Sequence, residues 1–524
     1  MSCIQLKNVS FHYTTPYKVI FSGLHVSIQS TWRTGLIGRN GRGKTTLLQL
    51  LRGAEHPDKG EVLMPLDAAY FPYTVSDASR TTHEVIRRAV APYDEWEAMM
   101  ATLSKSEDRN DLEKYADIHE TYCAHHGYEI DAFIAKEADL CGLTEEMRIR
   151  SFSTLSSGER TRALIAALFL RTNGFVILDE PTNHLDIDGR RMLAEYLRQK
   201  SGFLVVSHDR RFLDDCIDHI VVLEKETVEV RQGNYSSWKY NKDLFDMFEQ
   251  EKNCHLKKEI TQMKQVARER RDWSSHTEKS KKSAYDSGYM GHLAAKMMKR
   301  AKTAEHRIDN AIEEKETLFV NRERERRLKL EIASKKPGLL AAFYNVSCGF
   351  NGRLLFQNIS CEIHPGDRIA VSGPNGCGKT TLLRALCGEV TPLEGTVYLP
   401  AQTKIVRAHQ EPLWREGDLG EHIRISGIDA IRFRTILGSF GVSGEVFDRP
   451  LEFFSAGELK KIELCRSLIE PTHLLVWDEP LNYIDIMSRE QIEKVLLHDL
   501  PTIIFVEHDE YFIETIATKR ICLD

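Results

Sequence analysis

Short apolar runs that end in polar residues recur along the chain and predict buried strands. One such run, 34–37, leads through a glycine-rich turn into a helical pattern at 46–51, and the same order returns at 368–371 and 381–386. Another run, 175–178, ends in Asp-Glu and follows a helical pattern. Strands that are apolar throughout and alternate with helices are typical of an α/β fold with a parallel sheet.

The polar residues around these runs form an internal repeat, which predicts two similar domains. In each half, a Ser-x-Gly-Glu segment opens a helix, and its serine lies 24 residues before the second acidic residue of an Asp-Glu pair. A His-Asp pair ends a later apolar run, 28 or 29 residues further on. The serine, glutamate and histidine are Ser156, Glu180 and His208 in the first half, and Ser455, Glu479 and His508 in the second.

Each half also has a G-x-x-x-x-G-K-T motif between its first strand and helix, the context that a phosphate-binding loop needs. Glycines let backbone N–H groups wrap phosphates, lysine adds a point charge, and the threonine hydroxyl is a magnesium ligand. The candidate residues are Gly38, Arg39, Asn40, Gly41, Arg42, Gly43, Lys44, Thr45 and Thr46, and Gly373, Pro374, Asn375, Gly376, Cys377, Gly378, Lys379, Thr380 and Thr381.

The Asp-Glu pairs lie at the carboxyl ends of predicted strands, where a phosphate-bound Mg²⁺ and an attacking water would be held. The Ser-x-Gly-Glu helix starts offer free N–H groups to an anion. The alternative interpretation is an ordinary amphipathic helix before a core strand. The duplication of the whole arrangement argues against that alternative.

Together these motifs resemble the ATP-binding cassette (ABC) family over nearly the whole chain. The family signature LSGGE is similar to LSSGE at 155–159 and, more loosely, to FSAGE at 454–458; VILDEP, LLVWDEP, TNHLD and LNYID complete the set. The resemblance implies two cassette domains, each with a P-loop NTPase core and a helical subdomain. It also implies ATP hydrolysis with ATP and Mg²⁺. In this family two cassettes close face to face, and each ATP lies between one phosphate loop and the other cassette's signature helix.

The resemblance also implies a role for each candidate residue. Catalysis falls to Glu180 and Glu479, which activate water, and to His208 and His508, which sense the γ-phosphate. The implied magnesium ligands are Thr45, Thr380, Asp179, Asp478 and Gln410. One composite site takes its signature residues from Ser455, Gly457 and Glu458, and the other from Ser156, Gly158 and Glu159.

Two aromatic residues and two departures from the family pattern qualify these assignments. Tyr13 and Phe350 precede the phosphate loops and would stack on adenine; packing in the core of a first hairpin is an open alternative. Tyr73 stands where the first half should have the glutamine that the second half has at Gln410, so the magnesium shell of the first site is in doubt. Ala456 replaces a signature glycine and still permits close approach. We therefore expect two competent but unequal sites.

Two insertions predict the domain organisation. The first half carries 36 extra residues, placed near 92–131, whose pattern predicts a helical arm or a solvated surface hairpin. A proline-free stretch between the halves has apolar residues at helical spacing, which favours a long antiparallel helical hairpin. We expect a first cassette at 1–234, a linker at 235–337 with its tip near 272–291, and a second cassette at 338–524.

Charge is distributed unevenly along the chain. Residues 252–302 contain 14 Lys or Arg and 5 Asp or Glu, a net +9, whereas the rest of the chain carries −15. A basic projection on an acidic body is typical of a nucleic-acid partner, although a solvated helical spacer is an alternative. Cations mixed with aromatics suit irregular RNA. The candidate contact residues are Arg270, Arg271, Trp273, Lys279, Lys281, Lys282, Tyr285, Tyr289, Met290, Lys296, Lys299 and Arg300.

The cysteine content and the apolar runs of the sequence indicate in which cellular compartment the protein acts. The 11 cysteines include no C-x-x-C pair, which suits free thiols in a reducing cytosol. The first residues enter a strand pattern without a signal peptide, and no apolar run is long enough to cross a bilayer. We expect a cytoplasmic monomer without a membrane domain.

Two cassettes joined by a basic helical hairpin resemble the ABC-F translation factors, and the long tip is similar to that of the antibiotic-resistance branch (Lsa, Vga and VmlR types). That resemblance implies an ATPase that binds the ribosome near the peptidyl-transferase centre of 23S rRNA and the P-site tRNA. It implies protection from lincosamides, pleuromutilins and streptogramin A. A housekeeping ABC-F factor for stalled ribosomes, the motor subunit of an exporter and a DNA-repair cassette ATPase are the alternatives.

Overall fold

Two parallel sheets with matching strand order form the centres of the two halves. The order β5-β6-β7-β3-β8 in the first half corresponds to β14-β15-β16-β12-β17 in the second, and the first sheet adds an antiparallel edge strand, β9. The computed structural model describes residues 2–14, 17–106, 108–172, 174–183, 185–224, 227–280, 338–350, 353–442, 444, 447 and 449–523; the side chains of residues 250, 266–280 and 350 fall outside this description. The two-cassette α/β architecture expected from the repeat is therefore present.

The strands of the parallel sheets are apolar because both of their faces are covered. All four residues of β7 and of β16 are buried, as parallel strands require. The bounds in the first half are β3 (Arg33–Gly38), β5 (Asp67–Phe71), β6 (Gly174–Asp179), β7 (Phe203–Val206), β8 (His219–Leu223) and β9 (Val228–Gln232); those in the second are β12 (Arg368–Ser372), β14 (Ile405–Ala408), β15 (Leu474–Asp478), β16 (Ile503–Val506) and β17 (Lys519–Cys522).

A three-stranded antiparallel sheet packs over one face of each parallel sheet, with the helix that follows the phosphate loop in the same core. In the first half, Leu6 and Val26 of the antiparallel sheet share a core with Leu47 of the helix and Ile177 of the parallel sheet. The second half repeats this core. The elements are β1 (Cys3–Thr14), β2 (Tyr17–Gln29), β4 (Lys59–Leu63) and α1 (Lys44–Arg52), and β10 (Ala341–Phe350), β11 (Arg353–Ile363), β13 (Glu394–Tyr398) and α12 (Lys379–Leu386).

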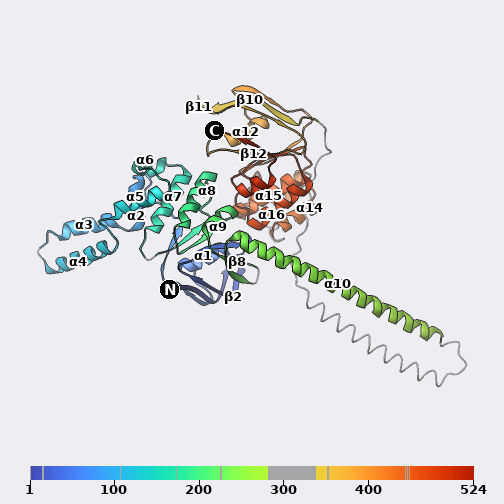
Figure 1. Cartoon of the computed structure of the whole chain (residues 1–524), viewed down its shortest axis with the longest axis horizontal. Coiled ribbons are helices and arrows are strands. Elements are labelled where there is room, and N and C mark those ends of the chain that lie inside the picture. The colour runs from blue at the N-terminus through green and yellow to red at the C-terminus, as the bar shows by residue number, and fades with distance from the viewer. Residues whose placement is uncertain are drawn as a thin grey trace, which may run out of the picture. The chain divides into compact units, whose positions relative to one another are not determined.

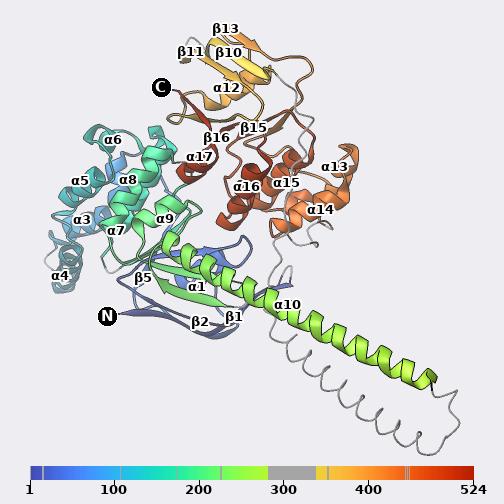
Figure 2. The same cartoon turned by 45° about the vertical axis from the view of Figure 1, so that its right-hand side comes forward.

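Helices cover the opposite faces and form the helical subdomains (Figures 1 and 2). In the first half they are α2 (Thr82–Val90), α3 (Tyr93–Leu103), α4 (Arg109–Ala124), α5 (Ile130–Leu140), α6 (Glu145–Ile149), η1 (Phe152–Thr154), α7 (Ser157–Phe169), α8 (Ile187–Arg198) and α9 (Arg210–Cys216); in the second they are α13 (Leu419–Ile425), α14 (Ala430–Ser439), η4 (Leu451–Phe453), α15 (Ala456–Ile469), α16 (Ile486–Asp499) and α17 (Glu510–Ile516).

The extra residues of the first half contain α3 and α4, which lie side by side in Figures 1 and 2. Their contact is aromatic, because the rings of Tyr93, Trp96 and Tyr122 meet edge to face at centroid distances of 5.6–6.5 Å. Edge-to-face aromatic pairs stabilise such a helix pair beyond the area that they bury. The range 92–131 thus holds two helices packed on each other.

The chain divides into two compact units, residues 1–236 with 326–524, and residues 237–325. The second unit contains most of α10 (Tyr235–Ser280), a single helix of 46 residues that spans about 69 Å (Figure 1). The helix continues through the first part of the predicted linker tip, 272–280. The expected return helix and the rest of the tip lie outside the described residues.

The apolar residues at helical spacing along α10 are buried to different extents. Glu249 and Ile260 are buried, whereas Leu244 and Phe248 are 48% and 64% exposed.

Among the described residues, no helix is both long enough and apolar enough to cross a membrane.

Candidate active site

Glycines give the two phosphate loops the same shape. Gly43 and Gly378, directly before α1 and α12, have φ angles of +90° and +101° in the left-handed region. A Cβ on Gly378 would lie 2.9 Å from the Phe356 ring, and one on Gly43 would overlap the Ile20 side chain. Glycine is therefore required at both positions for its conformation and for space.

The lysines of both loops are buried and fold back on their own loop. Lys44 Nζ donates to the Gly38 carbonyl oxygen at 2.8 Å, and Lys379 Nζ makes the equivalent bond to Gly373 at 2.8 Å. Burial lowers the pKa of Lys44, while Asp485, Glu180 and Asp179 act in the opposite direction. Each loop thus holds its lysine against its own backbone carbonyls. Glycine-rich loops of this kind suit a phosphate chain because their backbone N–H groups bind anions.

The acidic pairs lie where the strands of the central sheets end. Asp179 and Asp478 are the last residues of β6 and β15. Glu180 and Glu479 follow with φ angles of +51° and +48°, which non-glycine residues rarely adopt. Backbone strain of this kind persists only where the surroundings enforce it, and it is concentrated at functional sites.

Each candidate histidine lies against the glutamate of its own half. His208 Nε2 is 3.2 Å from Glu180 Oε1, and His508 Nε2 is 3.4 Å from Glu479 Oε1. The first pair is within ion-pair distance, but Glu180 Oε1 is buried without a well-directed hydrogen bond. The two halves therefore place the histidine and the glutamate alike, and the hydrogen bonding of the two pairs differs.

The two glutamates differ in their electrostatic surroundings. Burial raises the pKa of Glu180 to about 8, against the pull of Lys44. Burial acts in the same direction on Glu479, but hydrogen bonds from His508, Asn482 and Gln410 outweigh it and lower the pKa of Glu479. The second half is thus the better equipped to keep its glutamate ionised.

The second half offers oxygen ligands for a magnesium ion. Thr380 Oγ1 donates to Asp478 Oδ1 at 3.2 Å, and Asp478 Oδ2 is buried without a hydrogen bond, 3.7 Å from the Arg407 guanidinium. A hydroxyl, a carboxylate and the nearby Gln410 amide form the oxygen-rich ligand set that Mg²⁺ prefers.

The first half departs from this ligand set at the position where the sequence raised doubt. The Tyr73 hydroxyl donates to the Leu164 carbonyl of α7 at 3.3 Å, away from the acidic pair. Tyr70 instead donates to Asp179 Oδ2 at 3.0 Å. Thr45 is exposed at the start of α1. Tyr73 therefore does not take the place of the glutamine.

The signature serines cap their helices. Ser156 and Ser455 are the N-caps of α7 and α15, and each forms a reciprocal capping box with the glutamate three residues on, Glu159 or Glu458. The capping boxes define where each helix starts. They leave other N–H groups of the first turn available to an anion.

The first phosphate loop meets the second signature helix. Asn40 Nδ2 donates to the Tyr483 carbonyl oxygen at 2.8 Å, and the Asn40 N–H points to Asp485 Oδ2 at 3.4 Å. A Cβ on Gly457 would lie only 3.1 Å from Asn40 Nδ2. The structure therefore brings together these parts of the composite site that the resemblance implied.

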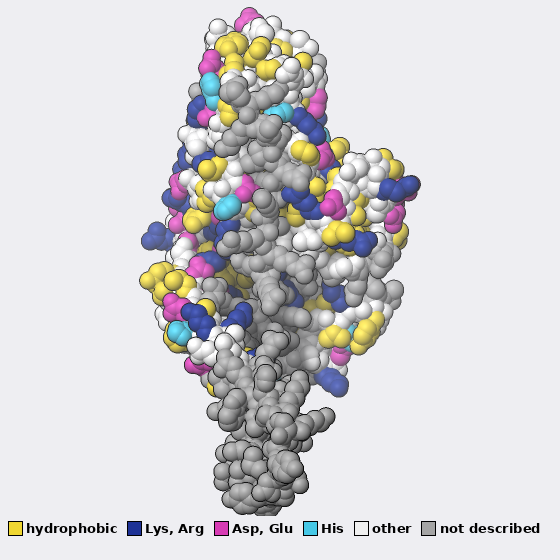
Figure 3. Space-filling view, turned by 90° about the vertical axis from the view of Figure 1, so that its right-hand side faces the viewer, with side chains coloured by type: hydrophobic (Ala, Val, Ile, Leu, Met, Phe, Trp, Pro, Cys, Tyr) yellow, Lys and Arg dark blue, Asp and Glu magenta, His cyan; other side chains and the backbone are white. Residues whose placement is uncertain are grey.

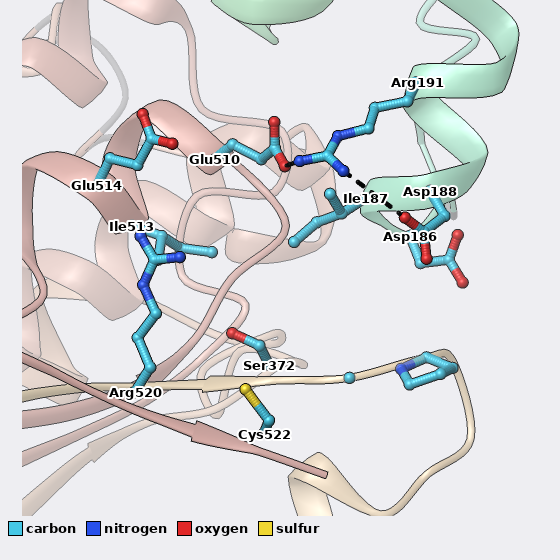
Figure 4. Close-up of a pocket in the computed structure, with 12 residues that line it drawn as sticks. Asp186, Ile187, Asp188, Arg191, Ser372, Glu510, Ile513, Glu514, Arg520 and Cys522 are labelled. Atoms are coloured by element: carbon cyan, nitrogen blue, oxygen red, sulfur yellow. Dashed lines mark hydrogen bonds and ion pairs between the residues drawn. The ribbon is translucent and has the colours of Figure 1, made fainter. Parts of the chain in front are cut away.

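A cavity lies beside the second phosphate loop. It has a volume of about 280 Å³, and its lining includes Gly373 and Pro374 of the loop and Asp186–Asp188 of the first half. At its rim, Arg191 reaches Glu510 of the second half (Figure 4). The second phosphate loop thus borders a cavity that residues of the first half also line.

Of the two aromatic residues expected to stack on adenine and the linker residues expected to contact RNA, the structure describes the side chain of Tyr13. The Tyr13 hydroxyl contacts Thr46 Oγ1 at 3.1 Å, and its ring packs edge-on against Phe11, so it lies beside α1 as part of the core. The Phe350 side chain lies outside the described residues. The same holds for the linker contact candidates, whether they fall within α10 (Arg270, Arg271, Trp273 and Lys279) or after it (Lys281, Lys282, Tyr285, Tyr289, Met290, Lys296, Lys299 and Arg300).

Sequence reasoning missed several residues that support the site. Asn482 donates to Glu479, and Lys461 forms a buried ion pair with Asp485 at 2.8 Å. Asn482 lies three residues after the candidate glutamate Glu479, and this position within the repeat was the available signal. The lysine on α15 offered no such signal, because a lysine inside a helical pattern is usually exposed.

Comparison with known families defines the class. A sequence model described as ABC transporter matches residues 21–183 and 356–482, more than half of the chain, and each match contains one phosphate loop and one Asp-Glu pair. The chain belongs to the ABC transporter family. With its two tandem cassettes it is an ATP hydrolase.

Relatives of known name are similar over almost the full chain. The chain is 27% identical to ABC transporter F family member 2 of Arabidopsis thaliana, over 99% of this chain and 76% of that protein. It is 28% identical to the ribosome protection protein VmlR of Bacillus subtilis (strain 168), over 99% and 86%. The solved structure of RNase-L inhibitor shares the fold, with a TM-score of 0.59 at 20% identity over 98% and 87%.

Proposed function

We propose that this chain is an ABC-F ATPase that binds the ribosome in its ATP-bound state and protects it from antibiotics of the peptidyl-transferase centre. The antibiotics concerned are lincosamides, pleuromutilins and streptogramin A. The observation that carries the proposal is the segment between the cassettes. A 46-residue helix starts there, and the sequence around it is strongly basic.

The linker supplies the chemistry for an RNA partner. Charged residues of both signs are interspersed on the face that Figure 3 shows. In the sequence, the 252–302 segment carries a net +9, whereas the rest of the chain carries −15. Phosphate-rich RNA attracts such a segment, and its aromatic residues can stack on unpaired bases. Ribosomal RNA near the peptidyl-transferase centre and P-site tRNA offer both.

A relative supports the ribosome-protection part of the proposal. The name ribosome protection protein belongs to a relative that aligns with 99% of this chain, linker included. The chain would act in the cytosol as a monomer whose two cassettes close on each other. A housekeeping ABC-F factor that rescues stalled ribosomes would share the ribosome binding but not the drug protection.

ATP would control the cycle by closing two composite sites. At the first, Lys44, Thr45, Asp179, Glu180 and His208 would act with Ser455, Gly457 and Glu458; at the second, Lys379, Thr380, Gln410, Asp478, Glu479 and His508 would act with Ser156, Gly158 and Glu159. Lysine and signature N–H groups stabilise charge on the γ-phosphate, and the glutamates orient the attacking water. Bound Mg²⁺ would neutralise phosphate charge at the threonine and aspartate oxygens. Because closure needs ATP, hydrolysis would release the ribosome.

Ribosome co-sedimentation of the Glu180→Gln/Glu479→Gln double variant tests the binding step. The variant should pellet with ribosomes in ATP and stay in the supernatant without it, because closed cassettes can no longer hydrolyse their ATP. The Lys44→Ala/Lys379→Ala variant, which loses the cation of both loops, is the control and should not pellet. If the double glutamine variant pellets equally with and without ATP, ATP does not control ribosome binding.

Drug susceptibility of a sensitive host then tests the protection step. Expression of the wild-type chain should raise the inhibitory concentration of all three drug classes, and the double glutamine variant should not. Unchanged susceptibility together with ATP-dependent ribosome binding would favour the housekeeping factor.

A further inference from the structure

Two amide side chains hold the carboxylate of Glu479. Asn482 Nδ2 donates to Glu479 Oε2 at 2.7 Å, and Gln410 Nε2 donates to the same oxygen at 3.0 Å. His508 lies 3.4 Å from the other oxygen, Oε1. Both carboxylate oxygens therefore have a fixed partner, which leaves the group little rotational freedom.

The first half has no equivalent arrangement among its described residues. Asn183, the counterpart of Asn482, bonds Glu180 through its backbone N–H, which donates to the Glu180 carbonyl at 3.2 Å, and no bond joins the two side chains. The Tyr73 hydroxyl donates its hydrogen bond to the Leu164 carbonyl oxygen and not to Glu180. The side chains of Glu180 and Glu479 are similarly accessible, 20% and 17%, so the contrast comes from hydrogen-bond donors rather than from exposure.

The turn that carries Asn482 is fixed on both sides. Before it, the Leu481 N–H donates to the buried carboxylate of Glu507 at 2.7 Å. After it, Tyr483 has a φ of +63°, and its carbonyl accepts the 2.8 Å bond from Asn40. In the first half, Thr182 and Ser207 occupy the places of Leu481 and Glu507 and pair through their hydroxyls at 2.9 Å.

We propose that Asn482 is a positioning residue for ATP hydrolysis at the second phosphate loop, and that the chain hydrolyses ATP mainly there. The inference rests on the proposed role of Glu479 as the residue that orients the attacking water. Asn482 holds the Glu479 carboxylate in one orientation. Asn40 of the first phosphate loop, through Tyr483, keeps the Asn482 turn in place. Glu180 lacks this support, so the first site retains its ATP longer.

Steady-state ATPase kinetics of Asn482→Asp and Asn183→Asp provide the test. Aspartate matches asparagine in shape but replaces the amide donor with a second carboxylate. Asn482→Asp should lower kcat about 10- to 100-fold, as expected when a catalytic group is misplaced, with KM for ATP changed less than about twofold. Asn183→Asp, the matched control, should change kcat by less than about twofold.

A third variant separates positioning from packing. Asn482→Ala removes the donor without adding charge, so kcat should fall in the order wild type, Ala, Asp. A merely structural role would give the opposite order for the two variants, because aspartate fills the site as asparagine does. Thermal melting and binding of a fluorescent ATP analogue verify that each variant is folded.

Glu479→Gln distinguishes the inference from the role on which it rests. If Glu479→Gln abolishes turnover while Asn482→Asp leaves kcat intact, Asn482 is not a positioning residue. An equal loss of kcat in Asn482→Asp and Asn183→Asp would overturn the inference that ATP is hydrolysed mainly at the second phosphate loop. If Glu479→Gln itself leaves hydrolysis unchanged, the proposed role of Glu479 fails.

Discussion

Arg210 of α9 and Glu493 of α16 form a buried, two-pronged ion pair that joins the two halves of the chain. Arg210 Nη1 donates to Glu493 Oε2 at 3.0 Å, and Nη2 contacts Oε1. The two side chains are only 5% and 8% exposed, and the Tyr511 ring lies 4.0 Å from the guanidinium. This bidentate geometry fixes the orientation of α9 relative to α16.

Loss of one partner of this pair should destabilise the chain strongly. Arg210→Met leaves the buried Glu493 carboxylate without its ion-pair partner, at a cost of about 3–5 kcal/mol. Denaturant unfolding followed by tryptophan fluorescence should show the loss. Arg211, the next residue on α9, pairs with Glu510 at 3.3 Å and with Glu514 at 3.6 Å, and its own side chain is 49% exposed. Arg211→Met should therefore cost less than about 1 kcal/mol, and a similar loss in both variants would contradict the importance of burial.

The buried carboxylate of Glu463 on α15 predicts an acid-dependent contribution to stability. Burial would raise the pKa of Glu463, but hydrogen bonds from His409 and Arg466 outweigh it and lower the pKa to about 2, from an ordinary 4.5. Because the folded pKa is the lower one, the contribution is complete above pH 4.5 and disappears as the pH falls toward 2.

Replacing Glu463 should remove this part of the acid sensitivity. Urea unfolding at a series of pH values measures the effect. The free energy of unfolding of the wild type should exceed that of Glu463→Gln by roughly 3 kcal/mol near pH 6, and the two values should converge near pH 2. Glu470→Gln, which removes the more exposed partner of Arg466, should show a much smaller and flatter difference. Parallel pH curves for wild type and Glu463→Gln would rule out the titration.

The contact between Gly457 and Asn40 predicts a defect specific to the first composite site. A Cβ on Gly457 would lie 3.0 Å from the Tyr483 carbonyl oxygen and 3.1 Å from Asn40 Nδ2, closer than ordinary contacts. Gly457→Ala should weaken the binding of an ATP analogue at the first composite site by about fivefold or more, because overpacking costs about 1 kcal/mol or more. Ala456→Gly, one residue earlier, is the control and should stay within about twofold; equal effects would show that the helix start, not the contact, matters.

The basic linker predicts a salt-dependent affinity for ribosomes. Lys279→Gln/Lys281→Gln/Lys282→Gln removes three charges from the segment, so the slope of log Kd against log salt concentration should decrease by about 2–3. Lys7, Lys18 and Lys59, which are exposed on the antiparallel sheet of the first half, form a matched control set. The corresponding triple glutamine variant should leave the slope unchanged. Equal slopes for both triple variants would place the RNA contact elsewhere.

Local sequence was sufficient for the parts of the site that lie on one stretch of chain. The glycines around Lys44 and Lys379 predicted the loops, because only glycine adopts the conformation and leaves the space that the loops need. The serines at 156 and 455 predicted helix starts, because a hydroxyl and a glutamate three residues on satisfy the first N–H groups. The acidic pairs followed from buried strands that end in charge, and the equal spacing of the repeat predicted that both halves fold alike.

Tertiary structure decided everything that depends on residues far apart in the chain. The sequence shows that Tyr73 replaces a glutamine, but only the fold shows its hydroxyl bound to Leu164 and Tyr70 bound to Asp179. The repeat placed one glutamate in each half, but only the fold shows that the donors around Glu479 come from separate loops and give it surroundings different from those of Glu180. Hydrogen bonding and burial act through space between elements that the chain order keeps apart, so sequence identifies the chemical groups and the fold determines which of them meet.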